Sequence, residues 1–231
     1  SIKEVLIKKS EPFKVHVLAL AAYAFMILLV AITLCFDSKL YPVGFDSLSL
    51  YMNTAKLIEG YHGLTQGGDA YNWSIMMSLG MIMYKSSLIS ILISVVPGIL
   101  CLLAIYKIGL MLKLNRNWSI FSCAVFYSLP NTIWQSKNDE KIDLAFLFIT
   151  LCSLIAFLSM QAIASTQKIK ETKTFLSRFA PDTTMWAICG VLIGFAFGIK
   201  YISMLSLFAF LSIIFYNYSG KYGAIAIFFI N

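Results

Sequence analysis

The sequence predicts an all-α, polytopic integral membrane protein with about six to seven transmembrane helices. Hydrophobic residues make up 59% of the 231 residues and charged residues only 13%, whereas about a quarter of a soluble domain is charged. The mean hydropathy is +0.81. Apolar runs long enough to cross a bilayer recur along the chain, and they lack the alternation of polar and apolar residues that marks a membrane β-strand.

The first apolar run, residues 15–36, predicts the first crossing, and a mostly polar segment follows it. We expect residues 37–84 to form an external loop that contains interfacial helices. Polar or small residues recur at helical spacing within this loop and would share one face of an amphipathic helix: Asp46, Ser49, Asn53, Lys56 and Gly60. The apolar run 74–84 is too short to cross and predicts a second interfacial or re-entrant helix.

Further crossings are predicted at residues 88–106, 118–134, 142–160, 185–199 and 202–216. Pro97 predicts a kink in the first of these runs, and Pro130 predicts a bend or break in the second. Another apolar run begins near residue 224 and continues to the last residue, which would be the start of a seventh helix. We therefore expect residues 1–231 to be one transmembrane domain that lacks its natural C-terminal part.

The distribution of charge predicts the orientation of the chain. Most of the 18 Lys and Arg residues fall on the side of the N-terminus, and most acidic residues between the spans fall on the other side. Because basic loops stay cytoplasmic, the N-terminus is predicted to be cytoplasmic, in a bacterial inner membrane. The net charge of +7 is thus explained by topology, and it does not call for a nucleic-acid partner.

Asp46 stands at the start of the amphipathic segment, and two interpretations of it stay open. Its carboxylate could cap the helix that begins at Ser47 by accepting backbone N–H bonds. It could instead be a general base at the membrane surface, or a ligand for a divalent cation near phosphate. The face that it shares with Asn53 and Lys56 favours function, because an interfacial helix does not need an aligned acid and base.

Three acids, Asp139, Glu140 and Asp143, lie where the apolar run 142–160 begins. Acids in the first turn of a helix are stabilised by the helix dipole, so a purely structural role is one interpretation. Asp143 is followed at once by apolar residues, and an acid at the mouth of a membrane cavity is a candidate functional residue. Asp139 and Asp143 are four residues apart and would share one helix face.

Lys200 ends the segment CGVLIGFAFGIKY on the same predicted side of the membrane. Three glycines in this segment recur at four-residue intervals and predict close helix packing: Gly190, Gly194 and Gly198. Lys200 could extend to the headgroups as an ordinary interfacial lysine, or it could bind a lipid phosphate at the outer interface. Lys56 and Lys85 compete with it for that role.

The predicted loops and spans contain three segments that can be compared with known families: GFDSLSLYMNTAKLIEG, SLPNTIWQSKNDEKIDLAFLF and GFAFGIKYISML. Together they resemble the GT-C superfamily of polytopic glycosyltransferases, in particular the protein mannosyltransferase and aminoarabinose transferase type. In this resemblance Asp46 takes the position of the catalytic acid in the first external loop. Asp139 or Asp143 would be the second acid, and Lys200 the lysine that follows a glycine-rich helix.

The resemblance implies sugar transfer, with inversion, from a polyprenyl-phosphate donor to an acceptor at the outer face of the membrane. Asp46 would be the base, while Lys56, Lys85, Lys200 or a divalent cation (Mg or Mn) would offset charge on the phosphate. Asn53 and Glu140 are further candidates for substrate binding. The expected partners are a lipid-linked sugar donor and membrane lipids, with a larger membrane complex as another possibility.

Two other functions are compatible with the sequence. The chain could be a non-catalytic subunit of a larger complex that keeps a glycosyltransferase-like scaffold. It could also be a transporter that uses Asp143 and Lys200, although transporters place such charges near the midplane and show repeated halves. The predicted charges cluster at one interface and the sequence shows no internal repeat, which favours the enzyme over the transporter.

Overall fold

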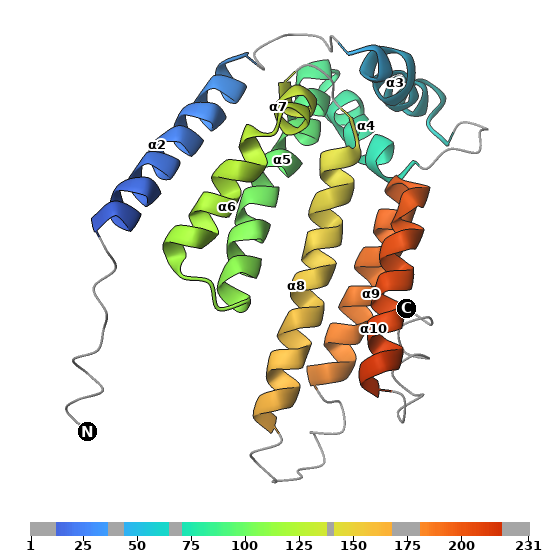
Figure 1. Ribbon diagram of the computed structural model, residues 1–231. Helices are drawn as coiled ribbons and strands as arrows, with labels where there is room; N and C mark the ends of the chain where they lie inside the picture. Colours follow the sequence, from blue (N-terminus) through green and yellow to red (C-terminus); the bar gives the residue numbers. More distant parts are fainter. Residues whose placement is uncertain (1–12, 37–43, 65–70, 138–140, 168–180, 219–231) are drawn as a thin grey trace, which may run out of the picture.

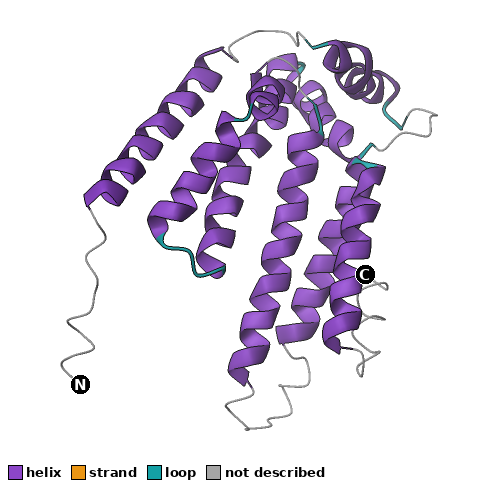
Figure 2. Cartoon of the chain, viewed as in Figure 1, coloured by secondary structure: helices purple, strands orange, loops and turns teal. Residues whose placement is uncertain are grey.

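The computed structural model describes residues 13–36, 44–64, 71–137, 141–167 and 181–218, and every element in these ranges is a helix (Figure 1, Figure 2). The long helices stand side by side, and α3, α4 and α7 gather at one end. In order, the elements are α2 (Phe13–Phe36), η1 (Ser47–Tyr51), α3 (Met52–Tyr61), α4 (Asn72–Tyr84), α5 (Ser87–Met111), α6 (Arg116–Ser128), α7 (Pro130–Lys137), α8 (Asp143–Gln167), α9 (Pro181–Ile199), η3 (Tyr201–Ser203) and α10 (Met204–Tyr218). The prediction of an all-α fold is confirmed for this part of the chain.

Two of the described helices are long and apolar enough to cross a membrane: Ser87–Met111 and the Asp143–Met160 part of α8. Shorter apolar stretches occupy Leu20–Leu29, Met185–Ile199 and Tyr201–Ile213. Each of the predicted crossings up to residue 216 overlaps a helix, while the total of six to seven crossings stays a prediction. The predicted start of a seventh helix lies outside the described residues.

The two prolines act differently. Pro97 lies buried inside α5, and the helix continues past it. Pro130 separates two helices, because α6 ends at Ser128 and α7 begins at Pro130. Leu129 between them is extended, as expected for a residue that precedes proline, and proline is well suited to the first position of a helix. The predicted break near Pro130 is therefore confirmed.

The amphipathic helix predicted in the segment 37–84 is present as α3, while the external position of this segment stays a prediction. Met52, Ala55 and Ile58 of α3 are buried, while Asn53 and Lys56 are exposed. Met52 and Ala55 belong to a core that joins α3 and α4 to the ends of the long helices α5, α8 and α9. Its members are Met52, Ala55, Trp73, Met77, Ile91, Val95, Ile142, Ala145 and Ile199.

α-Helical periodicity also predicts an apolar face opposite the polar one, made of Leu48, Tyr51, Met52, Ala55 and Ile58. This prediction is wrong at Leu48, which is 56% exposed, while Ser47 is fully buried. The cause is η1, which is a π-helical turn. A π-helix accommodates more residues per turn than an α-helix, so the residue that faces inward shifts along the chain. Periodicity calculated for an α-helix therefore fails over this one turn and holds again from Met52 onward.

Candidate functional site

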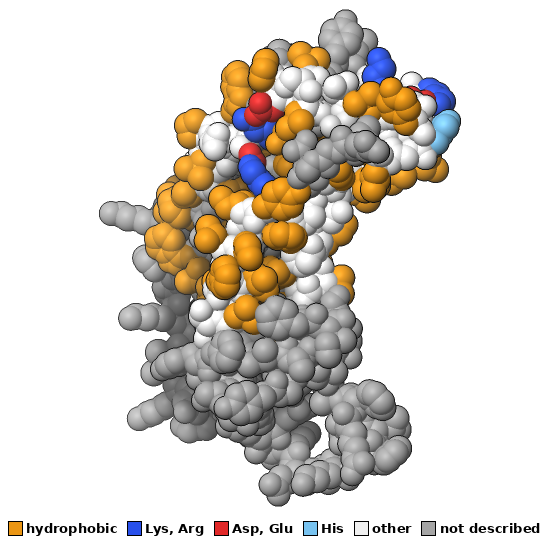
Figure 3. All heavy atoms as spheres, turned by 90° about the vertical axis from the view of Figure 1, so that its right-hand side faces the viewer, with side chains coloured by type: hydrophobic (Ala, Val, Ile, Leu, Met, Phe, Trp, Pro, Cys, Tyr) orange, Lys and Arg blue, Asp and Glu red, His pale blue; other side chains and the backbone are white. Residues whose placement is uncertain are grey.

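Among the described residues, three lysine–acid pairs lie at the end of the molecule where α3, α4 and α7 gather (Figure 1), and two of them meet near the start of α8. Nζ of Lys141 lies 2.9 Å from Oδ2 of Asp46. Lys200 pairs with Oδ1 of Asp143. Figure 3 shows acidic and basic side chains next to one another on this part of the surface, with hydrophobic side chains around them. The Lys141–Asp46 pair links the start of η1 to the segment before α8, and the Lys200–Asp143 pair links α8 to the end of α9.

Residues 141–143 carry one member of each of these two pairs. Ile142 between them is 4% exposed and is part of the core that joins α3 and α4 to the long helices. Its burial fixes the backbone on both sides, so Lys141 and Asp143 are held in place by an apolar anchor. The two ion pairs are therefore connected through three consecutive residues.

Asp143 is the first residue of α8, a position where the helix dipole stabilises a carboxylate. Asp143 therefore stands at the helix start, the position on which the structural interpretation rests, and its side chain has two partners outside this helix. Its Oδ1 pairs with Lys200, and its Oδ2 accepts a hydrogen bond of 3.1 Å from Nε2 of Gln135 on α7. Asp143 consequently connects α7, α8 and the end of α9.

Lys200 has extended backbone angles and lies between the end of α9 at Ile199 and the start of η3. The preceding turn is held against α4, because Nδ2 of Asn72 donates a hydrogen bond of 3.1 Å to the carbonyl of Phe195. A Cβ at Gly198 would come within 2.5 Å of Cγ of Asn72, so glycine is required for this contact. The contact fixes the end of α9 and hence the position of Lys200.

The predicted glycine stripe is only partly correct. Gly198 does permit a close approach, but the partner is the polar side chain of Asn72 on α4. A Cβ at Gly194 would meet no heavy atom within 4 Å, so this glycine is not needed for packing among the described residues.

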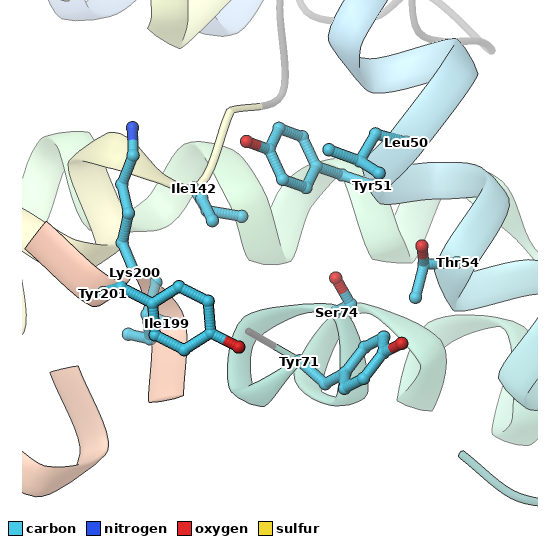
Figure 4. A pocket seen from close by; sticks show the side chains of 9 residues that line it. All are labelled: Leu50, Tyr51, Thr54, Tyr71, Ser74, Ile142, Ile199, Lys200 and Tyr201. Atoms are coloured by element: carbon cyan, nitrogen blue, oxygen red, sulfur yellow. The ribbon is translucent and has the colours of Figure 1, made fainter. Parts of the chain in front are cut away.

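Beside Lys200 lies a pocket of about 140 Å³ (Figure 4). Its lining residues are Leu50, Tyr51, Thr54, Tyr71, Ser74, Ile142, Ile199, Lys200 and Tyr201. In Figure 4 the η1–α3 residues stand on one side and the α9–η3 residues on the other, with Ser74 of α4 between them. Sites for whole small molecules occupy about 300–1,000 Å³, so this pocket suits a headgroup or another part of a larger ligand.

Asp46 lies beside this pocket's lining elements but is not itself among the lining residues. Its side chain makes no capping hydrogen bond, so the prediction that it caps the following helix is wrong. The residue already has helical backbone angles, and a cap acts from a residue with non-helical angles. The Asp46 carboxylate is turned instead to Lys141.

Three further predicted site residues, Asn53, Lys56 and Lys85, do not line the pocket. Asn53 and Lys56 are exposed on α3. Lys85 forms an ion pair with Glu59, and this hydrogen-bonded ammonium holds the pKa of the Glu59 carboxyl below its ordinary value. Asp139 and Glu140 lie outside the described residues.

The donor set gives limited support to a metal centre. Among the described residues no group of three or more His, Cys, Asp and Glu side chains could hold a metal ion. The three described carboxylates at this end, Asp46, Glu59 and Asp143, each already have a lysine partner. The residues that the structure describes therefore do not fit a divalent-cation site.

Several residues at this end were not predicted from the sequence. Lys141 and Gln135 hold the two acids, and Tyr51, Thr54 and Tyr201 line the pocket. Lys141 sits between acids in SKNDEKID, where a lysine is ordinarily a solvated loop residue. The sequence feature that could have indicated a fixed position for Lys141 is the apolar residue Ile142 directly after it. An apolar residue that becomes buried next to a helix start fixes the neighbouring backbone.

Part of the chain is similar to a curated protein of Archaeoglobus fulgidus, the dolichyl-phosphooligosaccharide-protein glycotransferase 2. The two are 25% identical over 150 residues, and the match covers 54% of this chain. It covers 25% of the archaeal protein, so the chain corresponds to about a quarter of the length of that relative. No protein-family model matches the chain, and no solved structure matches it.

Proposed function

We propose that this chain is the membrane part of a glycosyltransferase that moves a sugar from a polyprenyl-phosphate donor to an acceptor at the outer face of the membrane. The observation that carries the proposal is the position of Lys200, which lines a pocket at the end where the external helices meet the long ones. A lysine there suits a lipid-borne phosphate. The similarity to a protein named as a glycotransferase acting with a dolichyl-phosphooligosaccharide supports the same chemistry.

In the proposed reaction, the hydroxyl oxygen of the acceptor attacks the anomeric carbon of the sugar, with inversion. Asp46 accepts the hydroxyl proton as the new glycosidic C–O bond forms. The bond between the anomeric carbon and the phosphate oxygen breaks, and the electron pair leaves with the polyprenyl phosphate. Lys200 offsets the charge on this leaving group, so the phosphate would share or replace its present partner Asp143.

The test is the release of polyprenyl phosphate from polyprenyl-phosphate hexoses by membranes that contain the full-length protein. We expect Asp46→Asn to lower the rate at least about 100-fold, since a general base contributes about 10²–10⁴-fold. We expect Lys200→Met to lower it about 100-fold through the loss of charge stabilisation. Glu59→Gln is the matched control, because Glu59 is also paired with a lysine on the external helices but lies away from the pocket lining.

A second candidate is a non-catalytic subunit of a larger membrane complex. The observation that favours it is the pairing of Asp46 with Lys141, together with the absence of Asp46 from the pocket lining. In that case wild-type membranes would release no polyprenyl phosphate above those that lack the protein. Equal rates for wild type and Asp46→Asn would contradict the assignment of Asp46 as the base while leaving the transferase activity in place.

A further inference from the structure

We propose that the turn between α5 and α6 binds the phosphate headgroup of an anionic phospholipid through Lys107, Lys113 and Arg116. This turn lies at the opposite end of α5 from the pocket, so the inference does not depend on the proposed function. The surface concerned consists of the described residues 103–118, and none of them lines the pocket beside Lys200.

The depth of Lys107 in the membrane follows from the length of α5, one of the two described helices that can cross a bilayer. Lys107 follows Ser87, the first residue of the helix, by about 20 positions, which corresponds to a rise of about 30 Å. The hydrocarbon core of a bilayer is also about 30 Å thick. With Ser87 at one boundary, Lys107 lies at the other, and Lys113 and Arg116 lie beyond it among the headgroups.

Among the described residues, no acidic side chain on α5, on α6 or in the turn between them compensates the charge of this turn. Lys107, Lys113 and Arg116 are all exposed. The sequence contains no acidic residue between Asp69 and Asp139, so neither α5 nor α6 offers a carboxylate to these cations. Clustered cations at the edge of a transmembrane helix are complementary to anionic headgroups.

The backbone that carries the cations is held in a defined shape. A Cβ at Gly109 would come within 2.6 Å of Oγ of Ser119, so α5 and α6 pack at close range here. Leu114 N–H donates to the carbonyl of Gly109 at 3.0 Å, and the side chain of Asn115 accepts from Trp118 N–H at 2.9 Å. Because the backbone of this turn is already held, binding of a headgroup requires ordering of the side chains alone. The entropic cost of binding is therefore lower than for a turn whose backbone must also be ordered.

Apolar side chains accompany the cations and point to a lipid as the occupant. Leu112, Leu114 and Trp118 are exposed beside them. Tryptophan is enriched at the boundary between hydrocarbon and headgroups, where its ring contacts acyl chains. A surface that combines exposed leucines, a tryptophan and three cations at this depth suits a phospholipid, whose phosphate and acyl chains lie side by side.

The test uses tryptophan quenching by lipids brominated near the headgroup, with the full chain in vesicles of dibromo-phosphatidylglycerol or dibromo-phosphatidylcholine at equal bromine content. Trp118 is 46% exposed and Trp134, near the other end of the molecule, is 54% exposed. Trp134→Phe thus leaves Trp118 as the exposed reporter, and Trp118→Phe leaves Trp134. Trp73 and Trp186 are buried and contribute the same background to both.

We expect phosphatidylglycerol to be enriched about fivefold over phosphatidylcholine around Trp118. One Lys or Arg near a membrane surface contributes about 1 kcal/mol to the binding of anionic lipid, and this energy corresponds to about a fivefold preference. Trp134 should be quenched equally by both lipids. Lys107→Gln/Lys113→Gln/Arg116→Gln should abolish the preference while leaving quenching by phosphatidylcholine unchanged, which also shows that the variant is folded. Equal quenching of Trp118 by the two lipids would overturn the proposal, as would a preference that survives in the triple variant. If the triple variant does not fold, the three single variants must each reduce the preference.

Discussion

At the scale of single residues, Gly198 and Asn72 determine where Lys200 lies. The Asn72 side chain occupies the space that a Cβ of residue 198 would fill, and it binds the carbonyl of Phe195 from there. Lys200 follows directly, at the point where α9 ends. The absence of a Cβ at Gly198 thus permits the contact between α4 and α9 beside the pocket.

Gly198→Ala is expected to destabilise the protein by about 1–3 kcal/mol, because the added methyl group overpacks the contact and displaces the Asn72 hydrogen bond. The measurement is thermal unfolding in detergent. Gly194→Ala is the matched control, one turn earlier in the same helix and with no atom within 4 Å of the new Cβ. It should be neutral or stabilise by up to about 1 kcal/mol through helix propensity. Equal melting temperatures for the two variants would contradict the role given to Gly198.

The sequence predicted some of the site residues and missed others for a physical reason. Asp143 and Lys200 could be predicted, because each charge stands next to a long apolar run and such charges are costly unless they have a role. The partner of Asp46 could not, since Lys141 lies in a different part of the sequence and helical periodicity compares residues only within one helix. Asn53 and Lys56 were chosen from α-helical periodicity, and the structure exposes both.

At the scale of elements, the π-helical turn η1 determines which residues of η1 and α3 face the pocket. The turn brings Leu50 and Tyr51 to the pocket together with Thr54 of α3. Periodicity had placed Leu48 on the buried face, where the structure has Ser47. A local sequence pattern predicts that this segment is an amphipathic helix. It does not predict that one turn is π-helical, because that extra residue per turn depends on tertiary packing.

The pair between Glu59 of α3 and Lys85 at the end of α4 should make the contact between these helices depend on pH. The hydrogen bond and the charge of Lys85 lower the pKa of Glu59 below its ordinary value of 4.5. A lowered pKa means that the pair contributes its full stabilisation above pH 4.5, and that the stabilisation is lost as pH falls through the lowered value.

Glu59→Gln is therefore expected to have a lower melting temperature than wild type at pH 7, with a difference that shrinks below pH 4.5 and vanishes in more acidic solution. Lys85→Gln should show the same convergence, because it removes the other member of the pair. A difference between wild type and Glu59→Gln that stays constant from pH 7 to pH 3 would rule out the ion pair as its source.

At the scale of the whole molecule, α5 separates two polar ends. The pocket and the lysine–acid pairs lie at the end where α5 begins, and the basic turn lies where it ends. The apolar composition and the order of the helices were predictable, because transmembrane length and apolarity are properties of the local sequence. The assembly of the pocket from η1, α3, α4, Ile142, α9 and η3 was not, since it depends on contacts between distant segments.

Cysteine labelling from the two sides of the membrane tests this arrangement. In a background with the 5 native cysteines replaced, Lys56→Cys should react with a membrane-impermeant maleimide in intact cells. Leu114→Cys should react only after the membrane is permeabilised. This result follows from the prediction that α4 lies at the interface and from a single crossing by α5, which is long and apolar enough to cross. Labelling of both positions from the same side would contradict a single crossing between residues 56 and 114.

The lysine–acid pairs at the pocket end have a kinetic consequence. Asp46, Lys141, Asp143 and Lys200 together carry no net charge. Opposite charges a few ångströms apart cancel at the distances over which proteins attract ligands through solution. A phosphate-bearing lipid would therefore arrive by diffusion within the leaflet, at an encounter rate nearly independent of ionic strength. Its charge would be recognised only on contact, when it competes with Asp143 for Lys200.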